Sequence, residues 1–167
     1  MDEGGVVQLV NLIQEDFTNY KKPSLFLGFP YCTGKCNLVN KEIVCQNQIL
    51  HEAKKVEITI EEILELYQKN NITQAIVCGG LEPLDSPIEL LHLIEMFRKI
   101  SEDDFVIYTG YNKEEPQASM MIQNIKNLKI HNIIIKFGRY IKGDKPHYDD
   151  ILGVKLASNN QYGEKIC

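Results

Sequence analysis

Four short apolar runs constrain the fold more than any other feature of the sequence. The first three stop at Pro30, Gly79 and Thr109, which is typical of buried strands that end in turns. The runs occupy residues 24–29, 74–78, 105–108 and 130–136. We expect each of them to form one strand of a single sheet.

Helical periodicity fills the gaps between these runs. Thr59 and Ser86 are good N-caps, each followed by apolar residues at helical spacing, and residues 117–128 can form a third helix. The buried face of the second helix is predicted to comprise Ile88, Leu91, Ile94 and Phe97. Strands alternating with helices imply parallel β-α units with right-handed crossovers. The sequence therefore predicts an α/β fold with a partial (β/α) barrel-like parallel sheet, since there are too few units for a full eight-fold barrel.

The length of 167 residues predicts one domain over residues 1–167. Within it we expect a loose start at 1–5, a loop over 31–57 and an irregular tail over 137–167. Eighteen Lys and Arg against 23 Asp and Glu argue against a broad nucleic-acid-binding or anionic-membrane-binding surface. The acidic start lacks a signal-peptide pattern and no apolar run is long enough to span a bilayer, so we expect a cytoplasmic protein.

Five cysteines are the unusual feature, because a reducing compartment removes disulfides as their explanation. Cys32, Cys36 and Cys45 directly follow the first apolar run, and thiolates are the soft ligands of iron–sulfur clusters and zinc. Three cysteines suit a four-iron cluster with one open iron. Together with His51 they could instead form a closed Cys3His zinc site, or the clustering could be fortuitous. The spacing alone leaves these three readings open.

The other two cysteines have simpler explanations. Cys78 ends an apolar run and is predicted to be a buried small residue. Cys167 is the last residue and is predicted to be a dangling thiol.

Polar and glycine-rich motifs follow the predicted strands, where ligands bind in parallel sheets. Gly79 and Gly80 permit close approach of a ligand, and Glu82 offers a carboxylate, although the same residues also suit an ordinary strand-to-helix turn. Tyr111 could line a pocket or be a core aromatic. Asn160 and Gln161 could bind a ligand through a side-chain amide or belong to a polar turn.

Five segments in order resemble the small radical S-adenosylmethionine (SAM) activating proteins of anaerobic ribonucleotide reductase. They are Cys32-x3-Cys36, Gly79–Leu84, Tyr108–Tyr111, Gly138–Tyr140 and Ser158–Gln161, and the resemblance covers roughly residues 24–166. The cysteine spacing is Cys-x3-Cys-x8-Cys where the superfamily usually has Cys-x3-Cys-x2-Cys. Leu81 separates the glycine pair from Glu82, and Phe137 stands where the family has Asp.

The resemblance implies a [4Fe–4S] cluster held by Cys32, Cys36 and Cys45, with SAM on the fourth iron and no catalytic residue beyond these two groups. A flavodoxin-like or ferredoxin-like protein would reduce the cluster. The resulting 5′-deoxyadenosyl radical would take a hydrogen atom from a glycine of a partner such as anaerobic ribonucleotide reductase. The residues expected near SAM are Gly79, Gly80, Glu82, Thr109, Tyr111 and Asn160.

Two other functions stay open at this point. One is radical SAM chemistry on a small molecule, as in the similarly small deazaguanine synthases. The other is a zinc-binding or iron–sulfur-binding module without SAM turnover. A basic run could receive an acidic electron donor or could be only a solvated face. It consists of Lys136, Arg139, Lys142 and Lys145.

Overall fold

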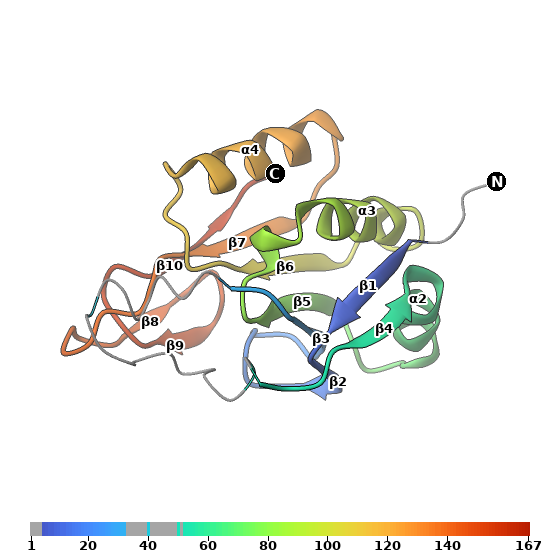
Figure 1. Ribbon diagram of the computed structural model, residues 1–167, viewed down its shortest axis with the longest axis horizontal. Coiled ribbons are helices and arrows are strands. Elements are labelled where there is room, and N and C mark those ends of the chain that lie inside the picture. The colour runs from blue at the N-terminus through green and yellow to red at the C-terminus, as the bar shows by residue number, and fades with distance from the viewer. Residues whose placement is uncertain (1–4, 33–39, 41–49, 51) are drawn as a thin grey trace.

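The computed structural model describes residues 5–32, 40, 50 and 52–167, and its centre is a six-stranded mixed sheet (Figure 1). The strand order is β10-β7-β6-β5-β3-β2, with the middle four strands parallel and the edge strands antiparallel to their neighbours. The parallel strands are β3 (Ser24–Phe29), β5 (Ala75–Gly80), β6 (Asp104–Tyr108) and β7 (Ile133–Phe137). The edge strands are β2 (Asn11–Asp16) and β10 (Tyr162–Lys165). An α/β fold with a parallel centre is therefore present, and a partial (β/α) barrel-like shape of the radical SAM type stays a prediction.

In the part of the chain that the structure describes, three helices of ten or twelve residues alternate with the parallel strands, as the periodicity predicts. They are α2 (Ile60–Lys69), α3 (Pro87–Arg98) and α4 (Pro116–Asn127). Thr59 and Glu62 form a capping box at the start of α2, and Pro87 and Pro116 occupy first turns, where a missing N–H costs nothing.

The buried face of α3 differs from the predicted one. Leu90, Leu93, Ile94 and Phe97 are buried, whereas Ile88 is 80% exposed. Ile88 belongs to the first turn, and the spacing that begins at Leu90 faces the sheet instead.

The two faces of the sheet are covered differently. Alternate strand residues, such as Leu27 and Ile107, pack with the three helices in the larger core. The residues between them, such as Val77 and Val106, pack in a smaller core against Tyr20 and two leucines of the C-terminal region. The helices thus cover one face, and segments from both ends of the chain cover part of the other.

The C-terminal region is more regular than the predicted tail. It contains β8 (His147–Asp149) and β9 (Val154–Leu156), which form an antiparallel hairpin, and β10 joins the sheet beside β7. Leu152 and Leu156 pack on the sheet, and the Leu152 carbonyl accepts a hydrogen bond from the Lys21 amide. These strands carry too few apolar residues to show a strand period.

The N-terminal region forms two strands that precede the first predicted apolar run. β1 (Val6–Leu9) pairs with β4 (Val56–Thr59), while β2 pairs with β3. Gly5 accepts a hydrogen bond from the Ile60 amide at 2.9 Å, and residues 1–4 lie outside the described part. In the part of the chain that the structure describes, no helix has the length and apolarity needed to cross a bilayer.

Gly80 provides a test of the tight junction between β3 and β5. Its φ is +82°, and a Cβ there would lie 2.7 Å from Gly28 Cα. We predict that Gly80→Ala lowers the free energy of unfolding by about 2–4 kcal/mol, because backbone strain and a backbone collision add. Urea unfolding under anaerobic conditions measures the change.

Gly143 offers a matched control, since its φ is +80° and a Cβ would meet nothing within 4 Å. Gly143→Ala should cost only the conformational strain, about 1 kcal/mol. Equal losses in the two variants would show that the close approach to Gly28 does not matter.

Candidate functional site

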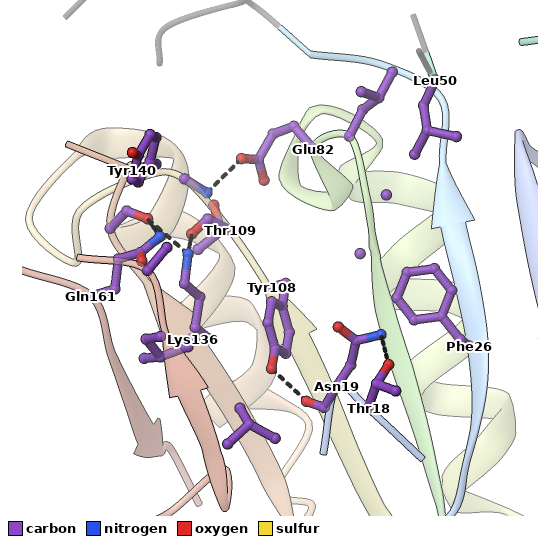
Figure 2. A pocket seen from close by; sticks show the side chains of 18 of the residues that line it. Thr18, Asn19, Phe26, Leu50, Glu82, Tyr108, Thr109, Lys136, Tyr140 and Gln161 are labelled. Atoms are coloured by element: carbon purple, nitrogen blue, oxygen red, sulfur yellow. Dashed lines mark hydrogen bonds between the residues drawn. The ribbon is translucent and has the colours of Figure 1, made fainter. Parts of the chain in front are cut away.

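A pocket of about 680 Å³ lies on the sheet face opposite the helices, within the size range of ligand sites. Its outer end is lined by residues that follow the parallel strands, among them Cys32, Glu82 and Gly110. Its inner end is lined by Asn19, Phe26 and Tyr108 (Figure 2). A third wall comes from the C-terminal region and includes Tyr140, Leu156 and Gln161.

The strand register explains why the sheet is hollow here. Gly28 pairs with Gly79, and Tyr108 pairs with Lys136 in the neighbouring strands. The two glycines therefore lie in one row with Tyr108 and Lys136 across the sheet. The glycines have no side chains, so this row is low on one side and high on the other. The Phe26 ring lies over Gly79, where a Cβ would come within 3.0 Å of it.

Cys32 is half-buried and lines the outer end of the pocket. The chain just before it is fixed to the chain that leaves β5. Phe29 O accepts a hydrogen bond from the Leu81 amide at 3.0 Å, and Tyr31 O accepts one from the Glu82 amide at 2.6 Å. Leu81 therefore holds β3 and β5 together through its backbone.

The remaining predicted metal ligands, Cys36 and Cys45, lie outside the described residues, as does His51. Within the described residues, no three His, Cys, Asp or Glu side chains are grouped to hold a metal ion. Cys78 is fully buried, as predicted, and burial raises the pKa of its thiol well above the usual value. Cys167 is half-buried and packs against the larger core, so the dangling-thiol prediction is wrong.

Glu82 is buried and connects the ends of β5 and β6. One carboxylate oxygen accepts a hydrogen bond from the Leu84 amide at 3.0 Å, and the other accepts one from the Gly110 amide at 2.8 Å. Burial, together with the smaller effect of the nearby Asp85 charge, raises the pKa of Glu82 to about 7, against the lowering effect of these two amides and of the Thr109 hydroxyl. The side chain therefore lines the pocket and also fixes its outer edge.

Thr109 lines the pocket, but Tyr111 is not among the residues that line it. Thr109 Oγ1 accepts a hydrogen bond from the Tyr111 amide. The Tyr111 hydroxyl donates to Asp85 at 2.6 Å, and its ring lies beneath the Arg139 guanidinium. Tyr111 thus stabilises the turn after β6 through contacts outside the pocket.

Asn160 is also outside the pocket lining, and its neighbour Gln161 lies within it. The Asn160 amide donates to Arg139 O at 2.8 Å and accepts from the Ser158 hydroxyl at 2.7 Å. Gln161 accepts from the Ser158 amide and donates to Gly138 O. Both side chains therefore take part in the polar turn, and Gln161 also lines the pocket.

Lys136 is a pocket residue that sequence reasoning misplaced in an exposed basic run. It is 7% exposed, and its ammonium group donates to Gly138 O at 2.8 Å and to Thr109 O at 3.5 Å. Arg139 forms an ion pair with Glu115 at 2.7 Å. The four basic residues therefore do not form one exposed patch. The sequence signal for a buried position was that Lys136 follows three isoleucines near the end of an apolar strand.

The family comparison supports an iron–sulfur cluster, which is one of the hypotheses based on the cysteines. Residues 22–161 match the family model described as a 4Fe-4S single cluster domain, and the chain belongs to this family. No curated protein and no solved structure matches the chain significantly.

The raised pKa of Glu82 predicts a pH-dependent stability. The folded state binds this proton more tightly than the unfolded state, so the stabilisation is present below about pH 4.5 and is lost as the pH rises through about 7. The shift corresponds to on the order of 3 kcal/mol. Urea unfolding at a series of pH values should show this loss in the wild type and not in Glu82→Gln.

The exposed Glu95→Gln substitution on α3 serves as the control and should follow the wild-type profile. Parallel profiles for the wild type and Glu82→Gln would contradict the assigned role of burial.

Proposed function

We propose that this chain is a radical SAM enzyme that generates a glycyl radical on a partner protein. The observation that carries the proposal is the position of Cys32 in a chain of the 4Fe-4S single cluster family. Its thiol lines the same pocket as Gly79 and Gly80 of the neighbouring strand. Ligand chemistry at the carboxyl ends of parallel strands is typical of such sheets.

The residues present fit the implied groups. A thiol at the mouth of the pocket suits a cluster ligand, and Gly79 and Gly80 line the same pocket without side chains of their own. Cys36 and Cys45 are the proposed companions of Cys32. When bound and reduced, such a cluster would supply the electron for cleavage of SAM to methionine and a 5′-deoxyadenosyl radical.

The protein's own contribution is to position the reactants and exclude water. Glu82 fixes the Gly110 amide, and Tyr111 braces the same turn through Asp85. The apolar rings at the inner end limit the water that can approach a reactive radical. Gly79, Gly80 and Thr109 are proposed to contact SAM directly, whereas Tyr111 and Asn160 act on its surroundings.

A small-molecule substrate is the second candidate, and one observation favours it. The C-terminal region forms a wall of the pocket instead of leaving that side bare. A walled pocket of this size can hold a small substrate beside SAM. The glycyl-radical function remains the leading proposal, because five sequence segments occur in the same order as in the activating proteins of anaerobic ribonucleotide reductase. A reductant of the flavodoxin or ferredoxin type is proposed for either function.

The metal assignment is tested by removing one thiol at a time. After anaerobic reconstitution the wild type should hold about four irons per chain and form 5′-deoxyadenosine from SAM on reduction. Cys32→Ala, Cys36→Ala and Cys45→Ala should each lower cluster content and product at least about tenfold. Iron analysis and chromatography of the products give the two measurements.

Cys78→Ala and Cys167→Ala are the matched controls, and both should keep the cluster. Tight stoichiometric zinc with no 5′-deoxyadenosine would instead identify a zinc-binding module and reject the radical SAM proposal.

The partner is tested by mixing the reduced protein and SAM with a glycyl-radical subunit that co-purifies with it or is encoded beside it. We predict a glycyl doublet in the electron paramagnetic resonance (EPR) spectrum. SAM cleavage without a doublet for every such subunit would favour the small-molecule substrate.

A further inference from the structure

Asn40 connects the cysteine segment, residues 32–50, to the C-terminal wall of the pocket. It stands between Cys36 and Cys45 in the sequence and belongs to the described residues. Its side-chain nitrogen donates to Tyr140 O at 3.0 Å, and its Oδ1 accepts a hydrogen bond from the Lys142 amide at 2.9 Å. Both ends of one side-chain amide are therefore bound to the backbone of a segment that lies 100 residues further along the chain.

This pairing fixes a position as well as stabilising a contact. A carbonyl and the amide two residues later face the same side of an extended chain, where a neighbouring β-strand would bind them. The Asn40 side chain takes the place of such a strand, because its donor and acceptor belong to one planar group. A shift of the two segments by one residue would break both hydrogen bonds.

The wall segment, residues 138–142, is held by side chains along its length. It pairs with no strand in the part of the chain that the structure describes. Asn160 donates to Arg139 O at 2.8 Å, and the Ser158 hydroxyl accepts a hydrogen bond from the Ile141 amide at 3.3 Å. Residues 139 and 141 thus bind the C-terminal turn, whereas the alternate residues 140 and 142 bind Asn40. Asn40 therefore supports the wall segment from the side that the turn does not reach.

Other described parts of the cysteine segment also meet the pocket. Cys32 and Leu50 line it, as does Tyr140 of the wall segment (Figure 2). The described residues near the start, the middle and the end of the cysteine segment therefore all lie at the pocket or on its wall. A metal group that holds the cysteines restricts the chain on both sides of Asn40, which lowers the entropy that Asn40 loses when it binds the wall.

We propose that Asn40 is a positioning residue that couples the iron–sulfur cluster to the C-terminal wall of the pocket. Because coupling between two sites is reciprocal, the wall segment in turn stabilises the bound cluster. The inference rests on the proposed function only in taking Cys36 and Cys45 as cluster ligands, and it requires no SAM chemistry.

Hydrogen–deuterium exchange of the reconstituted full chain tests the contact at the wall. In Asn40→Ala the Lys142 amide loses its acceptor, so it should exchange at least about threefold faster than in the wild type. Asn159→Ala is the matched control, because Asn159 is exposed and contributes its backbone amide, which alanine keeps, to a hydrogen bond with Asp144. Wild-type exchange of the Lys142 amide in Asn40→Ala would overturn the proposal.

A double-variant cycle tests the coupling at the cluster, which a purely local role of Asn40 would not affect. Asn160→Ala loosens the wall segment from the side opposite Asn40. We expect Asn40→Ala and Asn160→Ala each to release iron to a chelator at least about threefold faster than the wild type under anaerobic conditions. The double variant should release iron no faster than Asn40→Ala, because the wall acts on the cluster through this residue.

Two results of this cycle would contradict the coupling. One is wild-type iron release in either single variant, and the other is a double variant in which the two effects multiply. Formation of 5′-deoxyadenosine from SAM is measured on the same samples. Its absence with the expected pattern of iron release rejects the proposed function alone, whereas its presence with wild-type iron release in Asn40→Ala rejects the coupling alone.

Discussion

The pocket depends on one buried carboxylate, that of Glu82. Its two oxygens bind the amides of Leu84 and Gly110, and its own amide binds the Tyr31 carbonyl next to Cys32. One residue therefore ties together the chain segments that leave three parallel strands. Because an unpaired buried amide is costly, loss of this carboxylate would release the turn after β6 as well as the turn after β5.

A second buried carboxylate has a similar role at the other end of the pocket. Asp16 holds the connection between β2 and β3, and through it the Asn19 amide. The two carboxylates use hydrogen bonds to fix backbone and side-chain groups, which lets irregular segments line a defined cavity. The apolar rings of Phe26 and Tyr108 lie between these two polar ends.

Sequence patterns predicted the parts of this molecule that rest on local periodicity. The parallel strands, the three helices and the burial of Cys78 follow from runs and spacings within short windows. The strands after Phe137 and the exposed position of Ile88 did not follow, because they depend on packing between distant segments.

In the candidate site, too, residues in local motifs were predictable and residues positioned by distant contacts were not. Glu82 was predictable from its motif, but Asn19 acquires its orientation only from contacts with Asp16 and Tyr108.

In the proposed function, a [4Fe–4S] cluster held by Cys32, Cys36 and Cys45 keeps one iron open for SAM. Low-temperature EPR of the reconstituted, reduced protein tests it most directly, because ligand binding to an open iron changes the signal of the reduced cluster. We predict that adding SAM shifts the g values of a [4Fe–4S] signal. A four-iron signal that SAM leaves unchanged, or no iron–sulfur signal in a protein that holds zinc, would contradict the claim.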